Sequence, residues 1–164
     1  MDKQHLVAQL REHLLGVARV ARSARDAAAT EAREGATPAE RREDSRTAIE
    51  QGSMARAQDK RLREAEAAAE ALATFAPPRW GERSPIAVGA LVEVEDEDSG
   101  EGRTIFLAPV GAGVTLEGPG GDGLFAVITP SSPLGRALIG RRVGDSIDVT
   151  IERELRSYAI TWVA

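Results

Sequence analysis

Three carboxylate side chains, Glu40, Glu43 and Asp44, lie close together in a stretch rich in Ala, Arg and Glu. Spacings of three and four residues place all three on one face if the segment is helical. Carboxylate oxygens are the ligands that hard divalent cations take. A plainer role is open as well, because Thr37, Pro38 and Glu40 have the spacing of a helix N-cap, a first-turn proline and a capping-box glutamate.

Other residue types that often do chemistry point to packing or to loops. His5 and His13 have no carboxylate or thiolate partner at ligand spacing, so we interpret them as packing or surface residues. The acidic run 95–98 lacks the ligand order of an EF-hand and predicts a solvated hairpin loop. The glycine run 118–123 is followed by no Lys-Ser/Thr step and no helix start, which indicates a hairpin connection and not a phosphate cradle.

The two halves of the chain differ in composition. Residues 77–164 hold 13 of the 16 glycines, 7 of the 8 prolines and both tryptophans. In residues 1–76, apolar residues recur in steps of three and four, as on one face of a helix. These residues form two apolar seams, one on each predicted helix. The first is Leu6, Leu10, Leu14, Val17, Ala21, Ala24 and Ala28, and the second is Ile49, Leu62, Ala65, Ala69, Leu72 and Phe75. We therefore expect helices first and a sheet domain second, an α+β protein.

A turn signal at 35–38 separates the seams and predicts an antiparallel two-helix coiled-coil hairpin over residues 1–76, with its tip at about 35–46. The first helix, expected over 3–34, ends before Gly35, which suits the left-handed position beyond a helix end. Folding the chain about Ala36 places Leu62 near Leu10. A thin rod cannot enclose a substrate pocket, so its physical use is reach, although the rod alone also fits an oligomerising coiled coil.

Charge is divided between the halves too. Residues 1–76 carry 13 basic and 13 acidic side chains, and residues 77–164 carry 8 and 13, which gives the net charge of −5. A duplex-DNA-binding protein needs a basic face, so this class is disfavoured and a protein partner stays open. The outward cations of the predicted helices either pair with interleaved acids or form a weak basic stripe facing RNA. They are Arg19, Arg22, Arg25, Arg56, Lys60 and Arg63.

Targeting signals are not apparent. The chain has no cysteine, so disulfides and thiolate metal sites are excluded and nothing points to an oxidising compartment. The N-terminal residues lack the apolar core of a signal peptide, and no run approaches the roughly 18 apolar residues of a membrane span. We expect no membrane contact and a cytoplasmic location.

Residues 77–85 form a proline-rich linker, in which Trp80 is expected to pack at the base of the hairpin. Residues 86–164 then alternate short β-like runs with turns. Strands are predicted at 86–94, 103–108, 114–117, 124–129, 146–152 and 155–163, and one short helix at 133–139. Tyr158 and Trp162 alternate with small or polar residues in the last strand, and both are expected in the core. The domain is therefore small and mostly antiparallel.

Residues 128–145 combine a strand end, a Ser/Pro loop, a short helix and a glycine turn. Ser132 has the position of a helix N-cap, Pro133 that of the first helical residue, and Arg136 that of a surface charge. The stretch Ser131–Gly140, followed by Val143-Gly144-Asp145, resembles the signature SP(I/L)(A/G)RALLGK..GD of the bacterial Gre transcript-cleavage factors, GreA and GreB. The general layout of that family extends over nearly the whole chain.

The resemblance implies a coiled-coil hairpin followed by a compact FKBP-like domain that docks on RNA polymerase. Docking takes place on a coiled coil of the β′ subunit at the rim of the secondary channel. The docking residues that it implies are Ser131, Ser132, Pro133, Leu134 and Arg136. The hairpin enters the channel toward the active site. We expect the chain to be a monomer that meets nascent RNA only indirectly and has no catalytic residues of its own.

At the tip, the resemblance places the acidic pair of the family on Glu40 and Glu43, with Asp44 beside them. In Gre factors this pair helps to hold a magnesium ion that is shared with the polymerase active site, and so stimulates cleavage of back-tracked RNA. The factor alone binds no cofactor. Such a metal lowers the pKa of the attacking water and stabilises charge on the displaced phosphate.

This chain departs from the family at the tip. Arg41, Arg42 and Arg46 crowd the carboxylates, and Thr47 stands where an aromatic residue is common. Pro38-Ala39-Glu40 replaces the usual Gly-Asp opening. Two activities are therefore open: stimulation of RNA cleavage, or occupation of the channel that modulates or inhibits polymerase without cleavage.

Two other functional classes remain. An FKBP-like domain suggests a prolyl isomerase, which needs a concave aromatic lining. The helical half alone fits a coiled-coil interaction protein unrelated to transcription. An isomerisation assay on a proline peptide tests the first class, and retention on core RNA polymerase tests the second.

Overall fold

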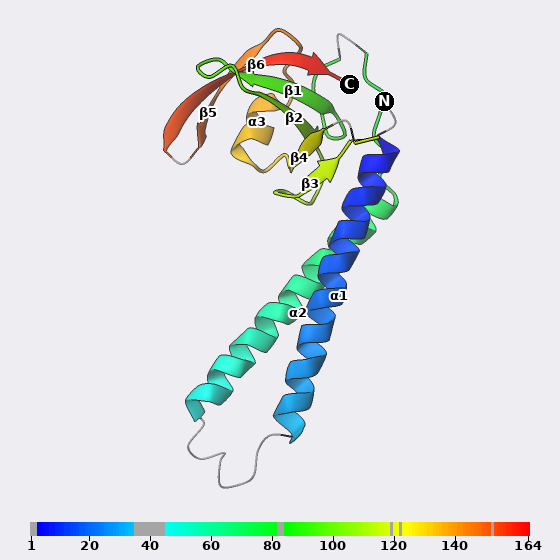
Figure 1. Cartoon of the computed structure of the whole chain (residues 1–164), viewed down its shortest axis with the longest axis vertical. Coiled ribbons are helices and arrows are strands. Elements are labelled where there is room, and N and C mark those ends of the chain that lie inside the picture. Colours follow the sequence, from blue (N-terminus) through cyan, green and yellow to red (C-terminus); the bar gives the residue numbers. More distant parts are fainter. Residues whose placement is uncertain (1–2, 35–44, 82–83, 119, 122, 152) are drawn as a thin grey trace. The chain divides into compact units, whose positions relative to one another are not determined.

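The computed structural model describes residues 3–34, 45–81, 84–118, 120–121, 123–151 and 153–164. Two long helices come first, α1 (Gln4–Glu34) and α2 (Ser45–Ala73), and a sheet with one short helix follows (Figure 1). The chain divides into two compact units, Arg11–Glu70 and Met1–Leu10 with Ala71–Ala164. The expected order of a helical hairpin and then an α+β sheet domain is confirmed.

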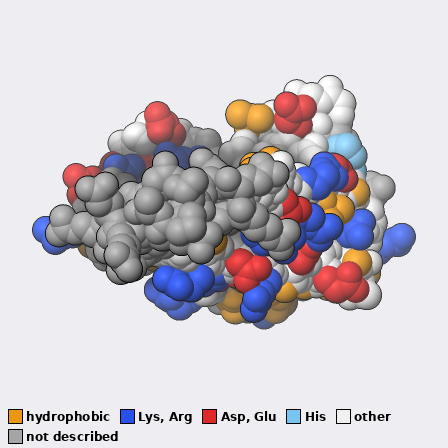
Figure 2. Space-filling view, turned by 90° about the horizontal axis from the view of Figure 1, so that it is seen from below, with side chains coloured by type: hydrophobic (Ala, Val, Ile, Leu, Met, Phe, Trp, Pro, Cys, Tyr) orange, Lys and Arg blue, Asp and Glu red, His pale blue; other side chains and the backbone are white. Residues whose placement is uncertain are grey.

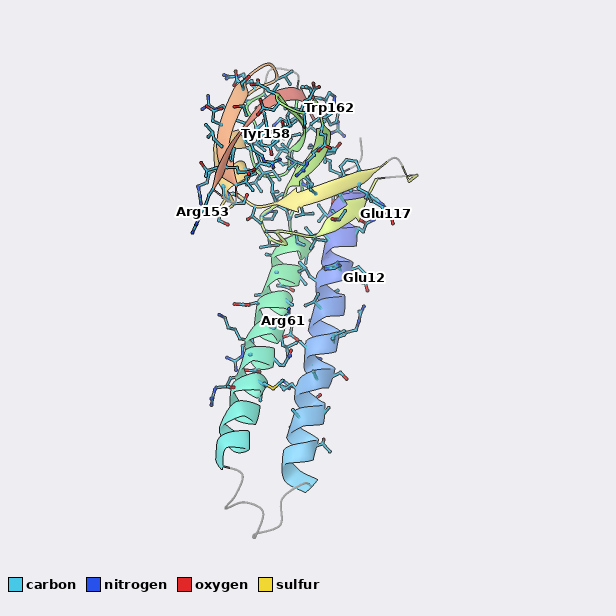
Figure 3. All side chains as sticks on the ribbon, turned by 60° about the vertical axis from the view of Figure 1, so that its left-hand side comes forward. Glu12, Arg61, Glu117, Arg153, Tyr158 and Trp162 are labelled. Carbon is cyan, nitrogen blue, oxygen red and sulfur yellow. The ribbon has the colours of Figure 1, made fainter. Side chains whose placement is uncertain are left out.

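Within Arg11–Glu70, α1 and α2 lie side by side and antiparallel (Figures 1 and 3). The seam between them is made of small residues, because Ala18, Ala21 and Ala65 are buried around Leu62. Leu62 therefore packs with these alanines, and not with Leu10 as predicted. The turn sequence predicts that the hairpin folds about Ala36. In the structure, Arg11 Nε donates to the Ala69 carbonyl at 3.3 Å, and the midpoint of this pair in the sequence is position 40. Side-chain pairing, more than the turn signal, sets the register of a hairpin.

The sheet unit contains six strands and one short helix. They are β1 (Leu91–Asp96), β2 (Gly102–Leu107), β3 (Thr115–Glu117), β4 (Leu124–Ile128), α3 (Pro133–Leu138), β5 (Ser146–Ile151) and β6 (Glu154–Val163). The spatial order is β3-β4-β2-β1-β6-β5. Neighbouring strands are antiparallel except β2 and β4, which run parallel. The sheet is therefore mostly antiparallel, as predicted, with one parallel pair that makes it a mixed sheet.

The main core of this unit lies on the face of the sheet that α3 covers. Its buried members are Ile86, Ala90, Val92, Val94, Ile105, Leu107, Leu138, Ile147, Val149, Tyr158, Ile160 and Val163. Leu138 of α3 is fully buried, and Leu134 and Ala137 pack against the same cluster. The helix is thus fixed to the sheet by one side, which leaves its other side at the surface.

The first strand begins later than the pattern predicts. The sequence pattern predicts a strand from residue 86, but β1 starts at Leu91. The Ile86 N–H donates to the Arg141 carbonyl at 2.8 Å, and the Gly140 N–H donates to the Ile86 carbonyl at 2.8 Å. Gly89 then has φ +97°, and a Cβ there would lie 2.9 Å from Pro78 Cδ, so the chain makes a glycine-dependent turn before it joins the sheet.

The two aromatic residues of β6, which Figure 3 labels, differ in their exposed fractions. Tyr158 is 3% exposed and belongs to the core, as predicted, but Trp162 is 39% exposed. The pairing of β1 with β6 shifts between Glu93 and Val94, so that Glu93 pairs with Trp162 but Val94 pairs with Ile160. One extra residue in a strand reverses the faces that the following side chains take, which explains the exposed tryptophan.

The first turns of α1 belong to the sheet unit and contact β3 and its neighbours. The Gln9 side chain spans the edge of β3, because its Oε1 accepts from the Glu117 N–H at 2.7 Å and its Nε2 donates to the Glu117 carbonyl at 3.4 Å. Leu10 lies against Gly111, where a Cβ would come within 2.7 Å of Leu10 Cδ1. These contacts protect an otherwise open strand edge. None of the described helices is long and apolar enough to cross a membrane.

Candidate docking site

The acidic tip residues Glu40, Glu43 and Asp44 lie outside the described residues, as do Arg41 and Arg42. Their assignment as magnesium ligands therefore stays a prediction. Among the residues that the structure describes, no three His, Asp or Glu side chains gather into a group that could hold a metal ion. His5 and His13 are both exposed, in agreement with their interpretation as surface residues.

The loop between β4 and α3 is held by a compact set of hydrogen bonds around the carbonyl of Thr129. Ser132 caps α3: its Oγ accepts from the Gly135 N–H at 2.9 Å, and its backbone is extended at φ −68° and ψ 154°. The same hydroxyl donates to the Thr129 carbonyl at 2.8 Å, and the Ser132 N–H reaches that carbonyl at 3.0 Å. Pro133 follows at the start of the helix, as predicted from its type.

Gly135 permits this close packing. A Cβ at this position would lie 2.0 Å from the Thr129 oxygen and 2.9 Å from Ser132 Oγ, well inside the closest approach of real atoms. The glycine is therefore required by a long-range contact with the end of β4 and not by its φ angle. The sequence signature contained this residue, but it did not indicate that Thr129 and Gly135 together fix the loop.

Arg136 folds back over the same loop. Its Nη1 donates to the Ser131 carbonyl at 2.5 Å, and its backbone N–H donates to the Ser132 carbonyl at 3.0 Å. Ser131 in turn shares a 3.0 Å hydroxyl–hydroxyl bond with Thr129. Arg136 remains exposed, so the other donors of its guanidinium group face solvent. All five predicted docking residues thus belong to one compact turn with its first helical turn.

The surface around this turn is apolar and basic. Pro133 is exposed, and Ile139 and Val143 are 42% and 43% exposed. Residues 131–143 contain three exposed arginines, Arg136, Arg141 and Arg142, and no Asp or Glu, although residues 77–164 as a whole are acidic. A partner that carries carboxylates beside an apolar ridge would complement this segment.

The outward cations of the hairpin are largely paired. Arg19 pairs with Glu12 at 2.8 Å, Arg63 with Asp59 at 2.5 Å, and Lys60 with Glu64 at 3.7 Å. Arg22 pairs with Glu66, and Arg25 with Asp26. Figure 2 shows Lys and Arg side chains interspersed with Asp and Glu on the face that it presents. This arrangement favours solvated ion pairs over a continuous basic stripe for RNA.

The acidic loop between β1 and β2 is a hairpin turn, as predicted. The Asp96 carboxylate accepts from the N–H groups of Asp98 at 3.1 Å and Ser99 at 3.0 Å. The hydrogen bond from the Ser99 N–H is the main cause that lowers the pKa of Asp96 below its ordinary value. The positive charge of Arg156, whose Nη1 lies 3.8 Å from Asp96 Oδ2, also lowers this pKa. Glu97 and Asp98 are exposed. Asp96, the buried carboxylate of this loop, therefore has a structural role.

Comparison with known proteins identifies the family of this chain. The family model "Transcription elongation factor, GreA/GreB, C-term" matches residues 82–164. Transcription elongation factor GreA of Desulfovibrio desulfuricans is 38% identical over 80 residues, 48% of this chain and 44% of the relative. GreA of Rhodospirillum rubrum is 40% identical over 78 residues, 48% of this chain and 45% of the relative.

Other relatives are named as transcription inhibitors. Transcription inhibitor protein Gfh1 of Thermus thermophilus is 30% identical over 80 residues, 49% of this chain and 47% of the relative. A crystal structure of Gfh1 of the same organism aligns with 94% of both chains at a TM-score of 0.40 and 23% identity. The chain spans about half the length of the curated relatives that it matches. Because the family model covers more than half of the 164 residues, this protein belongs to the GreA/GreB family of transcription elongation factors.

Proposed function

We propose that this chain binds RNA polymerase through Ser131–Arg136 and presents the tip of its hairpin to the active site through the secondary channel. The proposal rests on the fixed conformation of this docking segment, Ser131–Arg136. Hydrogen bonds to the Thr129 carbonyl and the close approach of Gly135 hold it in one conformation at the surface. A preformed segment loses little conformational entropy on binding, which favours a recognition role.

The chemistry of the segment supports an acidic partner surface. Arg136 has spare guanidinium donors that suit a carboxylate, and Pro133, Ile139 and Val143 offer apolar contact beside it. We assign the partner surface to the coiled coil of the β′ subunit at the channel rim. On this proposal the chain contributes no catalytic group of its own, and the polymerase performs the chemistry.

At the tip, Glu40 and Glu43, with Asp44 beside them, are proposed to share a magnesium ion with the polymerase active site. Carboxylate oxygens suit this ion, which keeps several of its waters and so has one available for attack on a phosphodiester. The expected result is stimulated cleavage of back-tracked RNA and rescue of an arrested elongation complex.

A second activity is favoured by a specific observation. Arg41, Arg42 and Arg46 lie among the tip carboxylates in the sequence and would compete with a metal for them. A relative at 30% identity is named as a transcription inhibitor. The alternative is therefore a factor that occupies the channel and modulates or inhibits polymerase without cleavage.

Two readouts on one stalled, back-tracked complex separate these proposals: retention of the chain on core polymerase, and release of the cleaved RNA. The variants are Glu40→Ala with Glu43→Ala, and Arg136→Ala, with Arg103→Ala as control because Arg103 is an exposed arginine elsewhere in the same unit. We expect the tip variant to be retained but to lose cleavage, Arg136→Ala to lose retention, and Arg103→Ala to behave as the parent chain.

Each failure has its own meaning. A parent chain that core polymerase does not retain would overturn the whole proposal. Retention of Arg136→Ala at the parent level would remove the docking assignment alone. A retained parent chain that slows transcription without releasing cleaved RNA would support the inhibitory activity in place of cleavage.

A further inference from the structure

The ammonium group of Lys3 is buried without a hydrogen-bond partner. Lys3 is 8% exposed, and among the described residues its Nζ is the buried side-chain polar atom that no acceptor satisfies. Nζ lies 4.2 Å from the centroid of the Trp80 ring, and this cation–π contact offsets part of the lost hydration. Three N–H donors remain for an acceptor. Burial accordingly lowers the pKa of Lys3 below its ordinary value.

Lys3 and Trp80 line a cavity of about 630 Å³, a volume in the range of small-molecule sites. Its other described lining residues are Gln4, Pro77, Pro78, Arg79 and Ala164. All of them belong to the same compact unit. The described walls therefore bring together two cationic side chains and three rigid rings.

The walls of the cavity are held in place before any ligand arrives. Trp80 Nε1 donates to the Pro85 carbonyl at 3.0 Å, and its ring packs against the core of the sheet unit. Pro77 and Pro78 restrict the backbone next to it. α1 begins at Gln4 with no acidic residue in its first turn, so its positive N-terminal end is an additional favourable element for a negative charge.

We propose that this cavity binds a small organic anion, with its carboxylate or phosphate group on Lys3 and Arg79 and a flat apolar body against Trp80 and the prolines. An anionic group supplies the acceptors that Lys3 lacks, and a ring fills the apolar wall. The site is separate from Ser131–Arg136, so it can be tested in the isolated chain, without polymerase.

The chain offers an internal control, because Lys3 and Lys60 are its lysines and Lys60 has a 77% exposed side chain. In a chain with ¹³C-labelled lysine and Trp162→Phe, Trp80 is the sole tryptophan. The probes are phenyl phosphate and benzoate, with benzyl alcohol to remove the charge and inorganic phosphate to remove the ring. The readouts are the lysine Cε–Hε signals and the fluorescence of Trp80.

We expect phenyl phosphate and benzoate to shift the Lys3 signal saturably and to change Trp80 emission, while the Lys60 signal stays in place. Benzyl alcohol and inorganic phosphate should each bind about tenfold more weakly or worse, because each lacks one half of the recognition. Lys3→Met should weaken phenyl phosphate by about tenfold or more, Lys3→Arg should retain it, and Lys60→Met should leave it unchanged.

Several results would overturn the proposal. One is a Lys3 signal that no probe shifts saturably, and another is a Lys3→Met chain that binds as the parent does. Inorganic phosphate that binds as tightly as phenyl phosphate would exclude the flat apolar body. Lys3→Met is expected to keep the urea midpoint of the parent, because methionine keeps an unbranched apolar side chain only one atom shorter than lysine and removes an unpaired buried charge. If this variant unfolds, the probe titrations of the parent and Lys3→Arg chains decide.

Discussion

Substitution of Gly135 by alanine sets two physical effects against each other. Helix propensity alone predicts that alanine stabilises α3 by about 1 kcal/mol relative to glycine. Packing predicts the opposite, because the new Cβ would start 2.0 Å from the Thr129 oxygen. Relief of this overlap requires a shift of about 1 Å or more, since real Cβ contacts under 3.0 Å are essentially never seen. Overpacking of this kind costs about 1–3 kcal/mol.

The shift also disturbs the hydrogen bonds of the loop. The Thr129 carbonyl accepts from the Ser132 N–H at 3.0 Å and from the Ser132 hydroxyl at 2.8 Å, and each such bond contributes about 1 kcal/mol net. Loss of one of them, added to the overpacking, exceeds the propensity gain. We therefore expect Gly135→Ala to lower the free energy of unfolding of the sheet unit by about 1–3 kcal/mol.

The assay is urea unfolding followed by tryptophan fluorescence, because Trp80 and Trp162 both belong to the sheet unit. Gly16→Ala is the matched control. Gly16 lies inside α1, where a Cβ would be in ordinary contact with Arg19 Nη2, at 3.8 Å. Followed by helical circular dichroism, it should gain about 1 kcal/mol. A Gly135→Ala chain as stable as the parent, or more stable, would refute the reasoning and show that the loop relaxes without cost.

Three smaller changes probe other contacts. Ser132→Ala should lower the free energy of unfolding by about 1 kcal/mol through loss of the N-cap, measured by urea unfolding, whereas Ser131→Ala should change it by less. Asp96→Asn should destabilise the chain at neutral pH. Because the folded pKa of Asp96 is depressed, the stability that its carboxylate contributes is present above the ordinary pKa of 3.8 and is lost as the pH falls through the folded pKa. The urea midpoints of the two chains should therefore converge on acidification, and a difference independent of pH would contradict this. Gln9→Ala should speed hydrogen exchange at the Glu117 N–H, whose acceptor is Gln9 Oε1, and an unchanged rate would mean that the β3 edge does not depend on this contact.

Local patterns in the sequence were sufficient for much of the fold. Apolar spacing located α1 and α2, and alternation located most strands to within a few residues. The cap of α3 was predictable because Ser132 accepts a hydrogen bond from Gly135, only three residues away, so a short stretch of sequence contains both partners. The family resemblance arose from the same segment, since residues that must form one tight turn leave a contiguous signature.

What only the tertiary structure decided depends on contacts between distant residues. Trp162 is exposed because a bulge in its pairing with β1 changes the face that it takes, and the register of β6 is not encoded in β6 alone. Gly135 is required by the carbonyl at the end of β4, and Lys3 meets Trp80 across 77 positions of sequence. The sequence by itself determined the elements and the family. The close approaches that fix the loop, and the buried ammonium beside its cavity, follow from how the chain packs, because a contact between distant residues leaves no periodic pattern in either of them.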